Sequence, residues 1–487
     1  MKYFSLFLLC PLLVFSQTTR NDTTYRQRYR PQFHFSPKKN WTNDPNGLVY
    51  FAGEYHLFYQ YNPFGDRWGH MTWGHAVSKD LVKWTELPPA IAEENGVMIF
   101  SGCVVIDSLN SSGFGKNAMV AIYTGHEEGK RQTQHLAYST DRGRTWTKYA
   151  QNPILNYTPE QRDFRDPNVI WYAPLQVWLM TVVLPNEQKA LFYHSKNLTN
   201  WTQAGEFQMK NTALGIWECP ALIDFDTPEG KKWLLLISVG KGAVAGGSGM
   251  QYFVGDFDGK NFIPQDTQTR WVDYGKDFYA AIPFNNSSQK IILGWMNNWQ
   301  YANNIPTSPF RGQMTLPREI SLVKKEGKFS LKQQPLKNHY EGALPTFFGN
   351  AKTLNNSFKS TKSTDNFGLN IKAEARDFLV KLKATDKSYT LVGYNAAQKE
   401  LYIDRTQSGL TGFSKDFPAR TTAPLLPDAN GLIHLRILVD RCSIEVFGND
   451  GEATMTNLIF PLDNSGGIRF EGDGLKEVQW YKPQNAW

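Results

Sequence analysis

Three acidic residues lie beside proline or aromatic residues rather than in runs of charge. Asp44 lies in the segment NWTNDPNG, Asp166 in FRDPN and Glu218 in WECP. Burying an unpaired carboxylate in such surroundings costs roughly several kcal/mol unless hydrogen bonds or an opposite charge compensate. A single Asp before a proline is usually a turn residue. Three acids in comparable settings, far apart in the sequence, instead indicate one shared chemical site.

A pair of carboxylates with opposite protonation states can cleave a glycosidic bond, because one attacks the anomeric carbon while the other protonates the leaving oxygen. The amides of Asn43 and Asn46 could donate hydrogen bonds that keep Asp44 ionised. The apolar ring of Trp217 would favour the protonated form of Glu218. The sequence therefore predicts that Asp44 is the attacking group and Glu218 the proton donor.

Asp166 differs from the other two acids because a cation directly precedes it in the sequence. Arg165 would keep this carboxylate charged, which suits a group that binds sugar hydroxyls and stabilises positive charge developing on a sugar ring. We therefore expect Asp166 to have a third role, distinct from attack and from proton donation.

Other kinds of site have weaker support. His70 and His75 flank Trp73, but no third metal ligand follows at a suitable spacing. The glycine-rich stretch 240–249 lacks the Lys-Ser/Thr pair and the following helix of a phosphate-binding loop. The formal net charge is +7 and the sequence pI about 8.9, but the basic residues are scattered and form no nucleic-acid motif. We therefore expect no metal, no cofactor and no nucleic-acid partner.

A turn pattern that closes on an aromatic residue recurs along the first half of the chain, in residues 78–84, 139–146, 195–201 and 255–262. The closing aromatics are 62, 55 and 61 residues apart. Repeats of this length with several strands are typical of propeller blades, whose innermost strands line a common channel. Units that begin near residues 40, 100, 165, 217 and 277 predict a five-bladed β-propeller, although the fifth has no obvious closing turn.

The sequence changes in character from about residue 345, where the closing aromatic no longer recurs. Leu435, Ile437 and Val439 alternate with polar neighbours, and a short turn then leads into another apolar strand. Strands at this spacing predict an antiparallel β-sandwich. The protein is thus predicted to be all-β, with a propeller domain over residues 33–335 and a sandwich domain over residues 346–487.

The three acidic motifs, taken in this order, resemble those of glycoside hydrolase family 32, the β-fructosidases that include exo-inulinases, levanases and invertases. The resemblance extends from about residue 35 to the end of the chain and implies a five-bladed propeller followed by a β-sandwich. It places Asp44 on the family's nucleophile, Asp166 on its transition-state stabiliser and Glu218 on its general acid/base. It also implies that no metal is needed.

The same resemblance implies a set of residues that line the fructose subsite. These substrate-binding candidates are Asn43, Gln60, Trp68, Phe100, Ser101, Arg165, Tyr279 and Trp299. Trp68 and Trp299, taken singly, also fit a packing role, because propeller channels need aromatic residues as filler. Asn43, Gln60 and Arg165 are therefore preferred to the aromatic candidates.

The implied activity is that of a retaining exo-β-fructosidase, which releases terminal β-D-fructofuranosyl units from sucrose or from fructans such as inulin and levan. Double displacement requires the carboxyls of Asp44 and Glu218 to lie about 5–5.5 Å apart. Three alternatives remain: a fructosyltransferase that uses the same fructosyl-enzyme intermediate, a propeller glycosidase acting on arabinose or xylose polymers, and a catalytically dead fructan-binding protein. The sequence leaves open the β-2,1 or β-2,6 preference and the oligomeric state.

The first residues have the features of an export signal. Lys2 precedes an apolar run over residues 3–15, and a cleavage site lies directly before Gln17. The run is too short to span a bilayer as a helix, and no other segment suits a membrane span. The sequence therefore predicts a signal peptide over residues 1–17 and a secreted or periplasmic protein.

Overall fold

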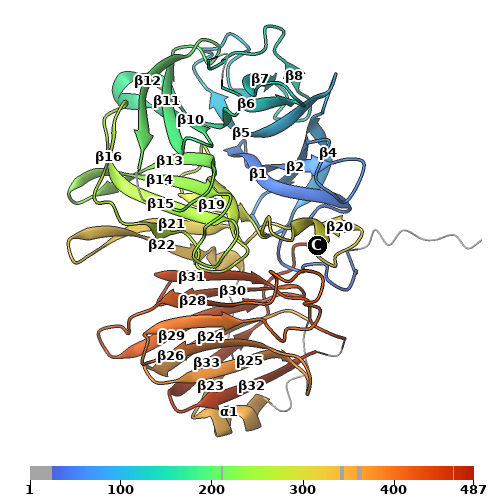
Figure 1. The fold of residues 1–487 in the computed structure, drawn as a ribbon, viewed down its shortest axis with the longest axis vertical. Coiled ribbons are helices and arrows are strands. Elements are labelled where there is room, and N and C mark those ends of the chain that lie inside the picture. Colours follow the sequence, from blue (N-terminus) through green and yellow to red (C-terminus); the bar gives the residue numbers. More distant parts are fainter. Residues whose placement is uncertain (1–24, 159–160, 210–211, 340–344, 359–364, 464) are drawn as a thin grey trace, which may run out of the picture.

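The fold is known from a computed structural model, which describes residues 25–158, 161–209, 212–339, 345–358, 365–463 and 465–487. Its strands form seven sheets, five arranged around a common axis in the upper half of Figure 1 and two packed face to face below them. The prediction of an all-β chain with a five-bladed propeller followed by a β-sandwich is therefore confirmed. The predicted signal peptide lies outside the described residues.

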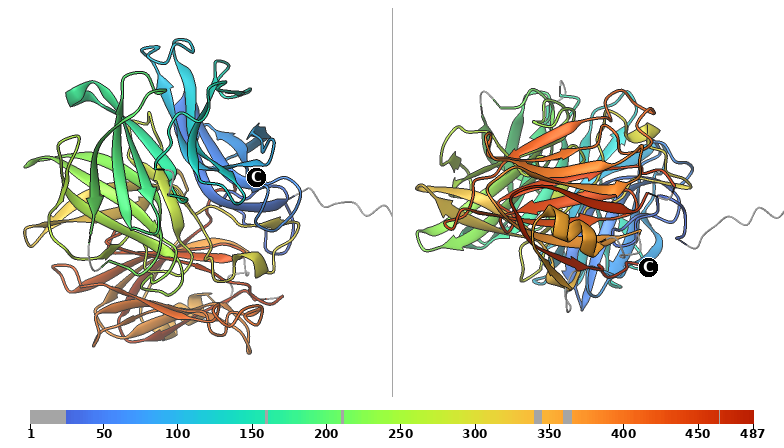
Figure 2. Two further views of the ribbon diagram at one scale, coloured as in Figure 1. Left: turned by 45° about the horizontal axis from the view of Figure 1, so that its top comes forward. Right: turned by 90° about the horizontal axis from the view of Figure 1, so that it is seen from below.

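The first three blades are antiparallel sheets whose strands follow one another from the axis outward (Figure 2). The first blade contains β1 (Asn40–Phe51), β2 (Glu54–Asn62), β3 (Thr72–Ser78) and β4 (Thr85–Ile91). The second contains β5 (Val97–Asp107), β6 (Ala118–Glu127), β7 (Thr133–Ser139) and β8 (Thr147–Lys148). The third contains β9 (Arg165–Tyr172), β10 (Val177–Leu184), β11 (Lys189–Ser195) and β12 (Thr202–Gln208).

The last two blades vary this plan. The fourth contains β13 (Trp217–Thr227), β14 (Gly230–Val239), β15 (Gly249–Phe257) and β16 (Phe262–Pro264), and β15 also pairs with β17 (Arg270–Trp271). The fifth contains β18 (Tyr279–Pro283), β19 (Ile291–Trp295), β21 (Arg318–Lys325) and β22 (Lys328–Pro335). The remaining strand, β20 (Phe310–Arg311), pairs in parallel with β1, so the chain returns from the last blade to the first.

The recurring turn joins the third and fourth strands of the first four blades. In the first blade, Ser78 Oγ and Asp80 Oδ1 each accept a hydrogen bond of 2.8 Å from a backbone N–H of the turn. Ser139 and Ser195 accept equivalent bonds of 2.9 and 2.8 Å in the next two blades, and Asp258 accepts one of 2.7 Å in the fourth. These local bonds explain why the pattern is visible in the sequence.

The fifth blade closes in a different way. Lys325 pairs with Lys328 across a two-residue hairpin formed by Glu326 and Gly327, with φ of 49° and 80°. Positive φ at both central residues is the type I′ arrangement that matches the twist of the flanking strands. Because this turn is so short, the fifth repeat has no closing aromatic to find in the sequence.

The five innermost strands, β1, β5, β9, β13 and β18, contact one another in a closed ring around the axis. Each has a β-bulge near its beginning, where the pairing register shifts within residues 42–45, 99–102, 165–168, 218–221 and 279–282. A bulge adds one residue, bends the strand and redirects side chains. Near the beginning of every inner strand, the side chains therefore do not alternate regularly between the two faces of the sheet.

The C-terminal body consists of two facing sheets. The first has the order β23 (Thr346–Phe348), β33 (Leu475–Tyr481), β24 (Phe367–Glu374), β29 (Leu432–Val439), β30 (Ser443–Gly448) and β31 (Ala453–Leu458). The second has the order β28 (Arg420–Pro424), β27 (Glu400–Asp404), β26 (Thr390–Asn395), β25 (Phe378–Ala384) and β32 (Gly467–Gly472). The predicted alternation is confirmed, since Leu435, Ile437 and Val439 are buried between the sheets.

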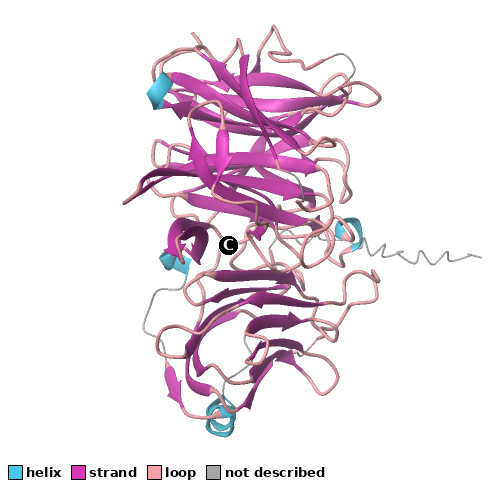
Figure 3. Ribbon diagram, turned by 60° about the vertical axis from the view of Figure 1, so that its left-hand side comes forward, coloured by secondary structure: helices cyan, strands magenta, loops and turns pink. Residues whose placement is uncertain are grey.

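Helices are few in the described part of the chain. The α-helix α1 (Ala351–Phe358) lies at the far end of the sandwich (Figure 3) and packs Leu354 and Phe358, one turn apart, into its core. Three short 3-10 helices are η1 (Ala173–Leu175), η2 (Ala302–Asn304) and η3 (Lys337–His339). Among the described residues, no helix has the length and apolar character needed to cross a membrane.

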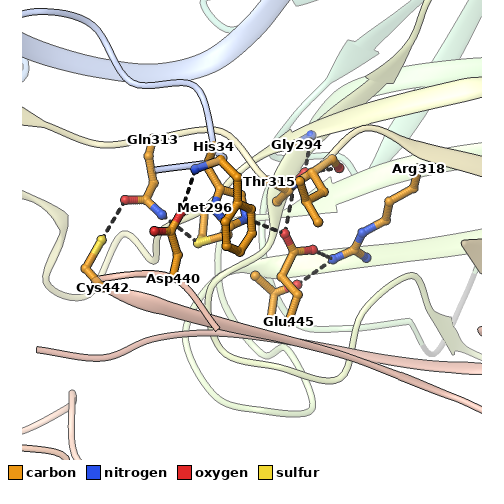
Figure 4. Close-up of polar contacts among 12 residues, drawn as sticks. His34, Gly294, Met296, Gln313, Thr315, Arg318, Asp440, Cys442 and Glu445 are labelled. Atoms are coloured by element: carbon orange, nitrogen blue, oxygen red, sulfur yellow. Dashed lines mark hydrogen bonds and ion pairs between the residues drawn. The ribbon is translucent and has the colours of Figure 1, made fainter. Parts of the chain in front are cut away.

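A chain of buried charges joins the propeller to the sandwich (Figure 4). Arg318 of β21 donates to Glu445 of β30 at 2.6 Å and to Asp273 at 2.9 Å. His34 bridges Asp440 and Glu445 with 2.8 Å contacts from its two ring nitrogens. All five side chains are buried. Because both imidazole nitrogens face carboxylates, His34 binds as the doubly protonated cation.

The stability of the fold is expected to decrease in alkaline solution because of His34. Burial alone would lower its pKa, but Asp440 and Glu445 outweigh burial and raise the pKa from 6.5 to about 9. A group of this kind stabilises the folded protein fully at any pH below its pKa in the unfolded chain. This stabilisation is lost as the pH rises through the pKa that the group has in the folded protein. The free energy of unfolding, measured by denaturant titration, should therefore fall between pH 6.5 and about pH 9. His34→Gln should flatten this dependence, and an unchanged slope in the variant would contradict the assignment.

Candidate active site

Asp44 lies in the bulge of β1 and is 8% exposed. Its Oδ1 accepts a hydrogen bond from Asn43 Nδ2 (3.0 Å), and its Oδ2 accepts one from Ser101 Oγ (2.7 Å). Cys219 Sγ lies 3.4 Å from the same Oδ2. Asn43 is held in turn by the indole N–H of Trp41, which donates to its Oδ1 at 2.7 Å. Strands of three different blades therefore fix the position of this carboxylate.

Asp166 lies at the start of β9 with a left-handed backbone, at φ 64°. Its backbone N–H donates to Thr124 Oγ1 (2.9 Å), and its Oδ2 accepts from the backbone N–H of Cys219 (3.0 Å). Cys219 is also left-handed, at φ 45°, and its Sγ lies 3.7 Å from Asp166 Oδ2. Non-glycine residues in this region are uncommon and need surrounding contacts to hold them. Cys219 is thus the residue that connects the Asp44 and Asp166 carboxylates.

Glu218 begins the bulge of β13 and keeps 20% of its side chain exposed. Its Oε1 accepts from Arg165 Nη2 (3.0 Å) and Nε (3.2 Å), and its Oε2 accepts from the hydroxyl of Tyr279. Burial and the charge of Glu218 raise the pKa of Tyr279 well above 10, so this hydroxyl remains a donor. Residues of the third and fifth blades therefore hold Glu218 between them.

The environment expected for Glu218 from its sequence neighbour is wrong. Trp217 is fully buried, with its ring 6.2 Å from that of Phe207 and 6.1 Å from that of Phe253. These residues belong to the core between the third and fourth blades. Successive side chains of a strand point to opposite faces, so Trp217 and Glu218 face different surroundings. The polar groups of Arg165 and Tyr279 surround Glu218 instead.

The role expected for Arg165 also differs in the structure. Its guanidinium lies 3.0 Å from Glu218 but 3.9 Å from Asp166. Burial therefore dominates at Asp166 and raises its pKa to about 7, while Arg165 opposes that shift without cancelling it. The neighbouring guanidinium therefore does not lower the pKa of Asp166 as the sequence suggested.

The two amides expected to keep Asp44 ionised contribute unequally. Asn43 donates to Asp44, as predicted, whereas the amide nitrogen of Asn46 donates to Ser101 Oγ (3.2 Å) and its oxygen accepts from Gln60 Nε2 (3.0 Å). Burial and the charge of Glu218 raise the pKa of Asp44 above its usual 3.8, and its hydrogen-bond donors only partly reverse this shift. The carboxylate predicted to attack is therefore harder to ionise than the sequence suggested.

Removal of the Ser101 hydroxyl should move the acidic limit of activity upward. The bond from Ser101 lowers the pKa of Asp44, and an ionised nucleophile is needed for attack. Ser101→Ala should therefore shift the acidic limb of the kcat/KM profile to higher pH by about one unit, the value of one charge-assisted hydrogen bond. Ser139→Ala, which removes a hydroxyl from a peripheral turn, is the control. A shift of the same size in both variants would contradict the prediction.

Four of the eight predicted sugar-binding residues contact the acids directly. Asn43 and Ser101 donate to Asp44, and Arg165 and Tyr279 donate to Glu218. Their donor groups come from four inner strands, and the five bulges bring them together. The predicted role of these residues in binding sugar stays a prediction.

Three aromatic candidates lie around the acids. Phe100 and Trp299 are partly buried against the apolar cluster that contains Cys219 and Tyr279. Trp68 is 41% exposed, and its ring centroid lies 6.0 Å from that of Phe100 in an edge-on arrangement. An exposed indole beside the acids suits contact with the apolar face of a sugar better than it suits packing.

Gln60 has a different position from the other candidates. It is 2% exposed, and its Nε2 donates to the backbone carbonyl of Ile99 at 3.0 Å. This contact supports β5 directly before Phe100 and Ser101. Gln60 therefore lies beneath the carboxylates, where it can fix the strand that carries Ser101.

Sequence reasoning missed two residues of the second blade that hold the acids in place. Thr124 of β6 accepts from the backbone of Asp166, and Gln132 Oε1 accepts from Arg165 Nη1 at 3.3 Å. Neither lies in a motif, and both reach the site only because blades two and three are adjacent. Cys219 is also absent from the predicted site residues, although its place within WECP was a signal for its role.

In the described part of the chain, no group of three or more His, Cys, Asp or Glu side chains has a geometry that could hold a metal ion. His75 faces His56, with their ring nitrogens 3.1 Å apart, and His70 faces Glu93. A cavity of about 890 Å³ at the opposite ends of the inner strands, lined by residues such as Trp171, contains none of the three acids.

Comparison with known families connects this arrangement to a group of enzymes. The profile described as the glycosyl hydrolases family 32 N-terminal domain matches residues 34–335, and that of the family 32 C terminal matches residues 328–484. The chain belongs to glycoside hydrolase family 32. The two matches cover both the propeller and the sandwich, which confirms the resemblance inferred from the acidic motifs.

Among relatives in family 32, the levanase of Bacillus subtilis (strain 168) is 45% identical over 490 residues, which cover 95% of this chain and 71% of the levanase. The extracellular exo-inulinase of Aspergillus awamori is 39% identical over 92% of this chain and 93% of the relative. The crystal structure of the Aspergillus awamori exo-inulinase aligns with a TM-score of 0.88 at 37% identity, covering 95% of this chain and all (100%) of that one. The β-fructofuranosidase of Schwanniomyces occidentalis complexed with fructosyl-erythritol aligns with a TM-score of 0.85 at 34% identity, over 94% and 98% of the two chains.

Proposed function

We propose that the protein is a secreted or periplasmic retaining exo-β-fructosidase that hydrolyses terminal β-D-fructofuranosyl units of inulin, levan and sucrose. The observation that carries this proposal is the convergence of Asp44, Asp166 and Glu218 at the bulged ends of the inner strands. The names of the levanase and exo-inulinase relatives support the substrate class, and the extracellular relatives support export.

In the first step, Asp44 attacks C2 of the terminal fructosyl unit while Glu218 gives its proton to the leaving oxygen. A covalent fructosyl-Asp44 ester forms, and the remaining sugar leaves as an alcohol. Asn43 and Ser101 orient the attacking carboxylate through the hydrogen bonds described above. Asp166 binds hydroxyls of the fructosyl ring and stabilises the positive charge that develops on it.

In the second step, the Glu218 carboxylate takes a proton from water, whose oxygen attacks C2 and releases fructose with retained configuration. Arg165 and Tyr279 hold Glu218 through both steps. This route needs the Asp44 and Glu218 carboxyls about 5–5.5 Å apart, as expected from the sequence. Trp68, Phe100 and Trp299 provide apolar contacts around the sugar.

All residues to which we assign a role in catalysis or sugar binding lie within one of the two predicted domains. The propeller over residues 33–335 carries the three acids and all eight sugar-binding candidates. The sandwich over residues 346–487 has none of them in its sequence.

Product release from sucrose, inulin and levan, assayed side by side with Asp44→Ala as the control, tests the proposal. We expect fructose to be the sole early product from the polymers and to be absent with the variant. The rates of its release from inulin and from levan then rank the two linkages. Longer oligosaccharides from concentrated sucrose would instead indicate a fructosyltransferase. Absence of fructose from all three substrates with a folded protein would reject the hydrolase, and binding without turnover would then identify a fructan-binding protein.

A further inference from the structure

The sandwich reaches the active site through one fully buried arginine. Arg405 follows β27, and all of its side chain is removed from solvent. Its Nε donates to Phe417 O (2.7 Å) and its Nη1 to Leu458 O (2.9 Å), both within the sandwich. Its guanidinium also lies over the Phe417 ring, 3.9 Å from the ring centroid. Arg405 is therefore a rigid part of the second domain.

The outer nitrogens of Arg405 contact two residues of the propeller. Nη1 pairs with Asp277 Oδ2, and Nη2 donates to the Tyr301 hydroxyl at 2.7 Å. The Tyr301 hydroxyl donates to Asp277 Oδ1 at 2.6 Å, which closes a three-membered network. Asp277 and Tyr301 are also fully buried. Water therefore cannot replace any member of this network.

The two propeller residues lie next to residues of the candidate site. Asp277 is two positions before Tyr279, whose hydroxyl donates to Glu218. Tyr301 is two positions after Trp299, whose ring lies 4.8 Å from that of Trp295 and packs against the cluster that contains Cys219 and Tyr279. The network thus ties together the two segments through which the fifth blade contributes to the site.

A second contact aligns the same part of the fifth blade. The segment before β18 runs along the edge strand β31, where Tyr274 N–H donates to Thr454 O (2.8 Å) and Asp277 N–H donates to Thr456 O (3.0 Å). Between them, a Cβ on Gly275 would lie 2.2 Å from Thr456 N, so only glycine permits this approach. The sandwich therefore determines where β18 begins.

We propose that Arg405 is a positioning residue that places Tyr279 and Trp299 against the reacting groups from the second domain. The inference rests on the proposed function, because the roles of Tyr279 and Glu218 belong to it. When the network is broken, Tyr279 no longer holds its bond to Glu218, and the carboxyl group of Glu218 loses one of the contacts that fix its position.

The test compares Arg405→Lys and Tyr301→Phe with His34→Gln, a control that disturbs the buried interdomain contacts without touching Asp277 or Tyr301. We expect kcat on sucrose to fall between about tenfold and 100-fold in the first two variants, with KM changed less than about threefold, because misplacement of reacting groups costs rate. His34→Gln should keep both quantities within about twofold of the unmodified protein.

Hydrogen–deuterium exchange separates this inference from the proposed function, because it requires no substrate. Faster exchange over residues 277–283 and 297–301 in Arg405→Lys and Tyr301→Phe, but not in His34→Gln, would support the positioning role even if the unmodified protein released no fructose. Unchanged exchange and unchanged kcat in Tyr301→Phe would overturn it. If Arg405→Lys does not fold, Tyr301→Phe decides, since its ring still fills the same space.

Discussion

Replacement of Asp44 by Asn is expected to lower kcat on sucrose by at least about 10⁴-fold, because no fructosyl ester can form without the attacking carboxylate. The amide has nearly the same shape as the carboxylate; its oxygen can still accept the bond from Asn43, and its N–H group can donate to the Ser101 hydroxyl, which can also act as an acceptor. The loss should therefore lie in kcat, with substrate binding largely retained. Initial rates and equilibrium binding of sucrose to the variant measure the two separately.

The same substitution is expected to make the protein more stable at neutral pH. The pKa of Asp44 is raised in the folded state by burial and by the charge of Glu218. Asp44 therefore stabilises the folded protein only below its pKa in the unfolded chain, near 3.8, where it is protonated. This stabilisation is lost as the pH rises through the pKa of Asp44 in the folded protein. Above that value the carboxylate is charged at a cost, and the neutral amide of Asp44→Asn avoids this cost. A rise in Tm is the expected sign.

Asp107, on a neighbouring inner strand, provides a control for which the expected change in Tm has the opposite sign. It is fully buried at the far end of β5, yet hydrogen bonds from Ser111 and Ser112 outweigh burial and lower its pKa. Asp107→Asn should therefore decrease Tm at neutral pH. If Asp44→Asn also decreased Tm, or retained more than about one-hundredth of the activity, the role assigned to Asp44 would be wrong.

Replacement of Glu218 by Gln is expected to lower kcat on sucrose and inulin by about 10³–10⁴-fold, because the leaving oxygen then departs without a proton. A substrate whose leaving group needs no proton should be affected far less in the first step. With β-fructosyl fluoride, the variant should still form the ester on Asp44, but water should attack it slowly without the Glu218 base. Mass spectrometry of the quenched protein should then detect one added fructosyl group.

An exposed glutamate serves as the control for this experiment. Glu206 of β12 pairs with Lys189 on the outer edge of the third blade, and Glu206→Gln should leave rates on both substrates unchanged. Equal losses on sucrose and on the fluoride in Glu218→Gln would argue against a proton donor. The absence of a labelled protein would argue against a covalent intermediate.

The parts of the fold that depend on local bonds could be predicted from the sequence. The Ser-x-Asp turns of the first blades are visible because both partners lie within a few residues, and they set the repeat length. The fifth blade could be counted only from its start, since its hairpin of Glu326 and Gly327 has no such pattern. The convergence of the acids followed from the rule that inner strands share one axis.

The surroundings of each acid could not be predicted, because they depend on strand faces and on other blades. Trp217 is the sequence neighbour of Glu218 but faces the opposite side of β13. Arg165 pairs more closely with Glu218, on the next blade, than with the adjacent Asp166. Adjacent residues of a strand face opposite sides, and residues of different blades meet at the axis, so adjacency in the sequence gave the wrong partner in both cases.

The parallel pairing of β1 with β20 has a consequence for biosynthesis. β1 carries Asp44, and its open edge is completed when Asn40 pairs with Phe310 and donates to Pro309 O at 2.7 Å. A ribosome that adds about 5–20 residues per second takes roughly ten seconds or more to reach that segment after the first blade has emerged. The nascent chain therefore remains an open, inactive crescent throughout this interval. Catalytic competence therefore cannot precede the synthesis of the last blade, late in translation.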